Sequence, residues 1–141
     1  MKVTGIHHIT LRSQNPVAAR RFYEEVIGLE FMEIPVSGEV TSIWKGAPAE
    51  GVLLATQAGS TFLVIAPPLE GTAEGDRFSE YRIGLDHLGF AVEDRAELDS
   101  LVERLRAASV ATEGVETDVV LGKEYVAFRD PDNVQWEAYM V

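Results

Sequence analysis

Apolar and polar positions alternate along most of the chain, and two stretches carry apolar stripes at helical spacing instead. The alternation predicts strands at about 5–12, 29–36, 40–45, 51–57, 61–66, 84–92, 117–121, 123–129 and 134–140. The helices are expected at 15–27 and 94–108, where Asn15 and Asp94 are suitable N-cap residues. Gly28 is a natural terminator of the first helix, and Glu97 completes a capping box in the second. The pattern is that of an α+β fold.

An internal repeat relates the two halves of the chain. The segment Gly5–Leu11 returns as Gly84–Phe90, at an offset of 79 residues that places His8 on His87 and continues without a gap through the first helix of each half. A repeat of this kind predicts two βαβββ modules, residues 1–66 and 84–141, joined by a connection at 67–83. One such module is too small to bury its sheet alone. We therefore expect a single domain, 1–141, of paired modules forming open, cupped sheets around a cleft.

Three potential metal ligands fall on the strands that would face this cleft. In the last strand, Trp136 suits the face under a helix, so alternation turns Glu137 toward the cleft. His8 and His87 lie on the first strand of each module and face the same space if both sheets are used alike. Two imidazoles and one carboxylate suit a single divalent ion, with Fe(II) or Mn(II) preferred and Zn(II), Ni(II) or Co(II) also acceptable. The sequence predicts a metal site with open coordination positions.

The chain resembles the vicinal oxygen chelate superfamily, which includes glyoxalase I, extradiol dioxygenases, fosfomycin thiol transferases and bleomycin-binding proteins. The segments that carry the resemblance are His8–Leu11, Phe22–Leu29, Asp86–Phe90 and Phe128–Glu137. The resemblance covers nearly all of the chain and is weakest at 35–52 and 67–82. It implies the paired βαβββ fold and metal ligands at His8, His87 and Glu137.

The resemblance also bears on the type of reaction. Overlaying the two hairpins by their turns places Leu63 where Glu137 lies, and leucine cannot bind a metal. Glyoxalase I and the related epimerase use a fourth protein ligand there, whereas extradiol dioxygenases and fosfomycin transferases use two histidines and a glutamate. The resemblance therefore favours a dioxygenase-like enzyme and leaves lyase, isomerase and thiol transferase activities open. The alternative is a metal-free small-molecule binding protein of the bleomycin-resistance type.

Several further residues are candidates for a role at the site. Thr10 matches a threonine that helps to orient the thiol in fosfomycin transferases, although threonine is also a common strand residue. Tyr139 and Gln135 share the Glu137 face and are candidates to support a ligand or contact the substrate, and Tyr139 or Tyr125 is the candidate acid–base group. Arg12 is expected either to point into the cleft between the sheets or to lie at the rim of this cleft. His7 falls on the opposite strand face from His8 and is expected to pack under a helix.

Composition narrows the classes of protein that fit. The net charge of −11 argues against a nucleic-acid-binding surface, and the absence of cysteine excludes disulfides and thiolate chemistry. Residues 1–4 run directly into a strand pattern without an apolar signal region, so we expect a cytoplasmic protein that acts on a small molecule and has no membrane partner. The resemblance implies a homodimer, and the metal site could lie within one chain or be shared by two.

Overall fold

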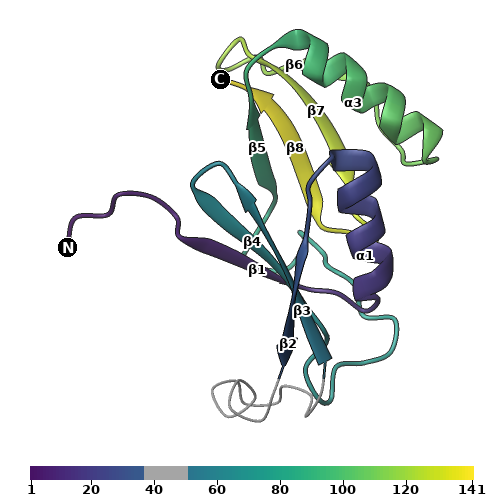
Figure 1. Cartoon of the computed structure of the whole chain (residues 1–141). Helices are drawn as coiled ribbons and strands as arrows, with labels where there is room; N and C mark the ends of the chain where they lie inside the picture. Colours follow the sequence, from purple (N-terminus) through teal and green to yellow (C-terminus); the bar gives the residue numbers. More distant parts are fainter. Residues whose placement is uncertain (37–50) are drawn as a thin grey trace. The chain divides into compact units, whose positions relative to one another are not determined.

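The computed structural model describes residues 1–36 and 51–141, which form two compact units, Met1–Asp76 and Arg77–Val141. Each unit contains a four-stranded mixed sheet and, among the described residues, one helical segment (Figure 1). The predicted α+β fold is confirmed. The division between the units falls inside the predicted connection. The predicted strand at 40–45 lies outside the described residues.

The first unit follows the predicted order closely. Its elements are β1 (His8–Arg12), α1 (Pro16–Phe22), the π-helical turn η1 (Tyr23–Ile27), β2 (Met32–Val36), β3 (Gly51–Ala58) and β4 (Thr61–Ala66). The sheet order is β1-β4-β3-β2, with β1 parallel to β4 and the other pairs antiparallel. Strand β1 begins three residues later than the apolar pattern predicts, at His8 itself.

The predicted ends of the first helical segment are confirmed. The side-chain oxygen of Asn15 accepts a hydrogen bond from the Ala18 amide at 3.1 Å, and Pro16 occupies the first turn, where its missing N–H costs nothing. Gly28 ends the segment with φ of +90°, a left-handed conformation that glycine adopts without strain. These two residues fix where β1 ends and β2 begins.

The second unit repeats the same plan. Its elements are β5 (Leu88–Val92), α3 (Arg95–Ala107), β6 (Val115–Thr117), β7 (Glu124–Arg129) and β8 (Gln135–Met140), in the sheet order β5-β8-β7-β6. Asp94 caps α3 by accepting from the Glu97 amide at 3.0 Å. The carboxylate of Asp130 accepts from the amides of Asp132 and Val134 and thereby closes the turn before β8.

The predicted strand at 117–121 is wrong, because β6 ends at Thr117 and a turn comes next. One carboxylate oxygen of Asp118 accepts hydrogen bonds from the amides of Val120 and Leu121, at 2.7 and 3.2 Å. Gly122 has φ of +65° and its amide donates to the Asp118 carbonyl at 2.7 Å. An aspartate that binds the amides two and three residues ahead competes with strand pairing, and this local effect outweighs the aliphatic run.

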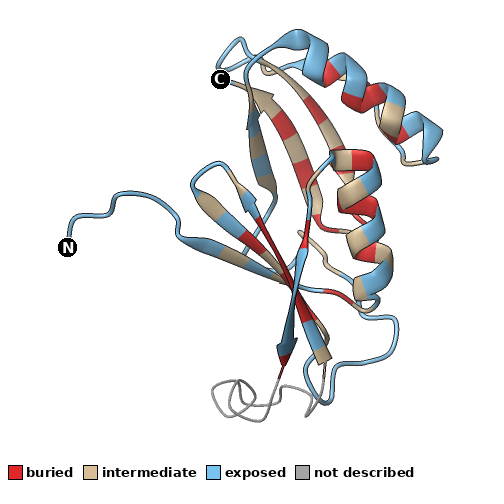
Figure 2. Cartoon of the chain, in the orientation of Figure 1, coloured by how far each residue is buried: buried red, intermediate tan, exposed pale blue. Residues whose placement is uncertain are grey.

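In each unit the buried positions lie mainly on the helical segment and the two inner strands of the sheet (Figure 2), and α1 contacts β4 whereas α3 contacts β6 and β7. In the second unit the apolar stripe of α3 and one face of β7 and β8 are buried, including Trp136, which is 2% exposed as its predicted helix-facing position requires. The buried side chains on these elements are Leu98, Leu101, Val102, Leu105, Val126, Phe128, Trp136 and Ala138. The opposite face of β8, which carries Glu137, is therefore free of the helix. No helix among the described residues is both long and apolar enough to cross a membrane.

Candidate metal centre

Glu137 lies on β8 between two small neighbours. Its cross-strand partners are Gly89 on β5 and Ala127 on β7. A Cβ atom added at Gly89 would approach only the Glu137 carbonyl oxygen, at 3.9 Å. The Glu137 side chain is 20% exposed, so its carboxylate is largely removed from water. The small neighbours Gly89 and Ala127 leave open space beside it. Such a group is costly unless it binds a partner.

His87 supplies the partner that the second unit offers to Glu137. It lies immediately before β5, and its Nε2 atom is 3.5 Å from Oε2 of Glu137. Two atoms that each lie about 2.1 Å from a common ion can be no more than about 4.2 Å apart. The observed separation is therefore compatible with binding of one ion by both side chains. A histidine nitrogen and a carboxylate oxygen are donors that divalent iron, manganese and zinc accept.

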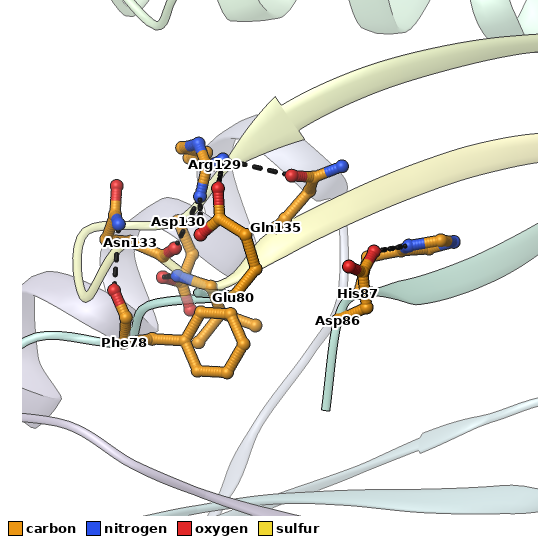
Figure 3. A network of polar contacts seen from close by, with 9 residues as sticks. Phe78, Glu80, Asp86, His87, Arg129, Asp130, Asn133 and Gln135 are labelled. Carbon is orange, nitrogen blue, oxygen red and sulfur yellow. Dashed lines mark hydrogen bonds and ion pairs between the residues drawn. The ribbon is translucent and has the colours of Figure 1, made fainter. Parts of the chain in front are cut away.

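Asp86 fixes which nitrogen of His87 faces Glu137. The Nδ1 atom of His87 is 2.6 Å from Oδ1 of Asp86 (Figure 3). A carboxylate can only accept, so Nδ1 donates to Asp86, and Nε2 is the nitrogen that is turned toward Glu137. Metal-bound histidines in proteins are commonly held by a carboxylate in this way. Sequence reasoning assigned no role to Asp86, although its place directly before His87 was the available signal.

His8, the third predicted ligand, belongs to the first unit, whereas His87 and Glu137 belong to the second. It begins β1 opposite Phe62 and is exposed. Within residues 1–36 and 51–141 the structure gathers no group of three or more His, Asp or Glu side chains suited to a metal ion. The His87–Glu137 pair is thus what the structure brings together, and the complete three-ligand set stays a prediction.

The prediction that His7 packs under a helix is wrong. His7 is exposed, its ring lies 5.8 Å from that of Phe62 between centroids, and its Nδ1 atom is 3.0 Å from Nδ1 of His8. The strict alternation of faces holds only within a strand, and His7 precedes β1. The two histidines therefore contact each other.

Thr10 and Arg12 share the strand face of His8. Their cross-strand partners on β4 are Val64 and Ala66, and Arg12 donates to the carbonyl oxygen of Pro67 at 2.9 Å. By register, Thr10 opposite Val64 in the first sheet corresponds to Gly89 opposite Glu137 in the second. The equivalent of Glu137 is therefore Val64, and the placement of Leu63 there is wrong by one residue. Valine cannot bind a metal either, so the absence of a fourth ligand at this position is unchanged.

Tyr139 is engaged with a residue that sequence reasoning missed. Its hydroxyl donates to Oδ2 of Asp118 at 2.7 Å, and its ring stacks on that of Tyr125 with centroids 6.0 Å apart. Burial, together with this hydrogen bond, raises the pKa of Tyr139 to about 12. The same bond, with those from the Val120 and Leu121 amides, lowers the pKa of Asp118 below its ordinary value. Tyr139 therefore keeps its proton at neutral pH and is poorly suited to act as a base.

Alkaline pH is expected to destabilise the fold through Tyr139. Since the pKa of Tyr139 is raised in the native state, its contribution to stability is complete below the ordinary tyrosine value near 10 and is lost as pH rises to about 12. Denaturant unfolding across this range should show a loss of stability that is smaller in Tyr139→Phe. An equal loss in that variant would contradict the assignment, and Tyr81→Phe, at an exposed tyrosine, is the control.

A second polar network lies at the start of β8, at the other end of the strand from Tyr139. The guanidinium of Arg129 donates to both carboxylate oxygens of Glu80, at 2.6 and 3.2 Å, and to the side-chain oxygen of Gln135 at 2.9 Å (Figure 3). Glu80 lies outside the sheet, between the start of the second unit and β5. The salt bridge to Arg129 lowers the pKa of Glu80. Gln135, predicted to share the Glu137 face, is thus held in place at the start of β8.

A family model described as the Glyoxalase/Bleomycin resistance protein/Dioxygenase superfamily matches residues 5–138. The chain belongs to this superfamily. It is 27% identical over 139 residues to the uncharacterized protein YwkD of Bacillus subtilis, covering 99% of this chain and 98% of that protein. The fold, the two sheets and the sequence resemblance therefore agree.

Solved structures of superfamily members support the same assignment. A glyoxylase/bleomycin resistance protein/dioxygenase domain from Frankia sp. EAN1pec superposes with a TM-score of 0.79 at 27% identity, covering 99% of this chain and 98% of that one. Lactoylglutathione lyase from Agrobacterium tumefaciens superposes with a TM-score of 0.66 at 22% identity, covering 99% and 96%. The fosfomycin resistance protein FosX from Listeria monocytogenes gives 0.66 at 19%, covering 99% and 95%. The last two show the shared fold alone.

Proposed function

We propose that this superfamily member is a divalent-metal-dependent enzyme whose small-molecule substrate chelates the metal through two adjacent oxygens, and that its chemistry is dioxygenase-like. His8, His87 and Glu137 would be the protein ligands. The observation that carries the proposal is the approach of His87 Nε2 to Glu137 Oε2, 3.5 Å apart, with Asp86 holding the other nitrogen. The fit of this donor pair to one ion supports Fe(II) or Mn(II), with Zn(II), Ni(II) and Co(II) acceptable.

The roles of the surrounding residues derive from their contacts. A bound divalent ion would act as Lewis acid and template for the chelating substrate. Gly89 and Ala127 leave room above Glu137 for the ligand, and Asp86 keeps His87 in the metal-binding tautomer. Tyr139, whose hydroxyl proton is donated to Asp118, can accept a hydrogen bond from a substrate but is not free to donate one through that proton. Thr10, on the His8 face of β1, stays a candidate substrate contact.

Asp86→Asn should weaken metal binding by about 10–100-fold, the usual effect of removing a carboxylate that holds a metal-bound histidine. The side-chain oxygen of the asparagine can still accept a hydrogen bond from Nδ1 of His87, but without a negative charge it no longer raises the basicity of the imidazole ring. The measurement is calorimetric titration of the apoprotein with Mn(II) and Zn(II). Asp99→Asn, an exposed aspartate on α3, is the matched control.

The outcomes also separate the proposed enzyme from a metal-free binding protein. An apoprotein that binds neither metal at millimolar concentration would favour the binding protein. Binding that is equally tight in wild type and Asp86→Asn would instead remove Asp86 from the proposed site.

We further propose that the protein assembles as a homodimer. Strands β1 and β5 are outer strands of their sheets, and exposed aliphatic side chains precede each of them: Val3 and Ile6 before β1, Ile83 and Leu85 before β5. Outer strands with exposed apolar neighbours favour association with another chain. A dimer would allow His8 of one chain to complete the site formed by His87 and Glu137 of the other.

Mixing two inactive variants tests whether the site is shared. His8→Ala and Glu137→Ala homodimers each lack a ligand at every site. If sites are shared, a mixed dimer contains one site with all three ligands, and about half of the dimers formed by random exchange are mixed. Metal binding should then be recovered after unfolding and refolding of the mixture, measured per chain against each variant alone. No recovery, with exchange shown by mass spectrometry, would contradict the shared site, and a monomer at micromolar concentration would contradict the dimer.

A further inference from the structure

The second unit contains a cavity of about 450 Å³ beside the Glu137 face. It lies between the loop that comes after α3, at residues 110–113, and the end of β7 at 127–130. Gln135, two residues from Glu137 on β8, and Ala127, the cross-strand partner of Glu137, are among its lining residues. The volume is within the range of small-molecule pockets. None of the three proposed metal ligands, His8, His87 and Glu137, is among its lining residues.

The cavity exists because β6 begins late. Strand β6 pairs with β7 only along Val115–Thr117, and continued pairing would bring residues 112–114 against 127–129. Instead the Gly114 amide bonds to the Thr112 hydroxyl at 3.2 Å, and Gly114 has φ of +91°. This turn takes the loop away from the strand. Gly114 is required here, since a side chain at that φ is strained.

Charges of both signs line the cavity. Arg77 and Arg129 contribute positive charge, and Glu113, Glu116 and Asp130 contribute negative charge. Asp130 is buried, and its carboxylate accepts from the amides of Asp132 and Val134, so it belongs to the wall. Four of the five N–H groups of Arg129 already bond to Glu80, Gln135 and the Asn133 carbonyl, so Arg129 is a fixed part of the wall. Arg77 is exposed and makes a single long bond, 3.3 Å, to the Pro131 carbonyl oxygen. Its guanidinium retains donors for a ligand.

The acidic side is also accessible to a ligand. Glu113 and Glu116 are both exposed, and burial and then the charge of Glu116 raise the pKa of Tyr125 on the neighbouring strand. A purely anionic ligand would meet two glutamates and a chain of net charge −11, which disfavours its approach. A purely cationic one would meet Arg77. A ligand that carries both charges matches the lining without net repulsion.

We infer that this cavity is a binding site for a small zwitterion, with its carboxylate on Arg77 and its ammonium group on Glu113 and Glu116. The apolar lining from Val110, Ala111 and Ala127 would contact the chain between the two charges. The cube root of the volume, roughly 8 Å, suits an amino acid whose charges are separated by several methylene groups. The inference does not depend on a metal.

The test uses ε-aminocaproate and two analogues that each lack one charge, caproate and hexylammonium, on the full chain. Backbone amide NMR shifts of Ala111, Thr112 and Ala127 should saturate with ε-aminocaproate, with affinity about threefold to fivefold above that for either analogue. This is the ratio expected when one exposed ion pair is gained. Arg77→Gln should reduce ε-aminocaproate to the affinity of hexylammonium, and Glu113→Gln should reduce it toward that of caproate. Arg82→Gln and Glu103→Gln, outside the lining, are the matched controls.

Two outcomes would overturn the inference. One is an equal affinity for the three compounds, which would show that the charges on the wall do not select the ligand. The other is an absence of saturable shifts at these amides in a wild-type protein whose spectrum is that of a folded chain. Since the titration is made without metal, either failure leaves the proposed metal site untouched, and failure of the metal titrations leaves this inference standing.

Discussion

Replacing Glu137 by glutamine is expected to remove specific divalent-metal binding. Glutamine has nearly the same shape as glutamate but lacks the negative charge, so the variant changes the ligand and spares the packing. The loss in affinity should exceed the 10–100-fold that results from losing an outer partner of a ligand. Titration of apoprotein with Mn(II) and Zn(II) measures it. Glu103→Gln, on the exposed side of α3, is the matched control and should bind as wild type does.

Thermal unfolding gives a second and independent measurement of the same variant. A metal that binds only the native state raises the free energy of unfolding with the logarithm of the ratio of metal concentration to Kd. At a metal concentration of a hundred times Kd, this gain is about 2.7 kcal/mol. The wild type should therefore gain stability with Mn(II), whereas Glu137→Gln should not. A variant that gains as much as wild type would show that the metal binds elsewhere. Without metal, Glu137→Gln should be no less stable, since a half-buried carboxylate is costly when it has no ion to bind.

The features that the sequence predicts correctly are those set by local rules. Asn15, Gly28 and Asp94 define the ends of the helices because their side chains or backbone freedom act on neighbouring residues. Period-two alternation places Trp136 on the buried face and Glu137 on the other, because the two faces of a strand are fixed by the pleat. The repeat relates β1 to β5 and the first helical segment to α3 for the same reason, since each module must bury an equivalent face.

The features that it misses depend on turn geometry and on contacts between distant residues. The first hairpin pairs one position further past the turn than the second: Val64 is three residues after Thr61, the first residue of β4, whereas Glu137 is two residues after Gln135, the first residue of β8, so overlaying the turns leaves these strands one residue out of phase. That shift is why Val64, and not Leu63, corresponds to Glu137. Asp118 and Tyr139 are far apart in sequence, and no local pattern indicates that one binds the other.

Of the site itself, the sequence supplies the ligand types and the structure supplies their orientation. Alternation places Glu137 on the face of β8 opposite the buried Trp136, whereas His87 lies immediately before β5, outside the strand. Their mutual approach depends on the pairing of β5 with β8, and the choice of His87 nitrogen depends on Asp86. The chemistry of Tyr139 changes most, because its hydrogen bond to Asp118 makes it an acceptor toward ligands rather than a base. A dioxygenase-like reaction would therefore need its proton transfers to come from the substrate, the metal-bound water or a residue of another element.

Trp136→Ala is expected to cost about 3–5 kcal/mol of stability, the usual effect of truncating a buried tryptophan. Trp136 is 2% exposed and its ring stacks on that of Phe90, with centroids 4.3 Å apart and planes 5° from parallel. Its cross-strand partner on β7 is Phe128, which is also buried. Removal of the indole leaves a cavity on the buried face of the second sheet that these aromatic neighbours can fill only in part.

A loss of this size is a large share of the roughly 5–15 kcal/mol that stabilises a typical domain, so the second unit of the variant should be partly unfolded on mild heating. Urea denaturation followed by circular dichroism measures the change in the free energy of unfolding. Tyr81→Ala, at a 92% exposed position, is the control and should shift it by less than about 0.5 kcal/mol. Trp136 also precedes Glu137 on β8, so the variant should bind metal less tightly because the strand that carries the ligand is less ordered. A loss below about 1 kcal/mol would show that Trp136 contributes little to the buried core of the second unit.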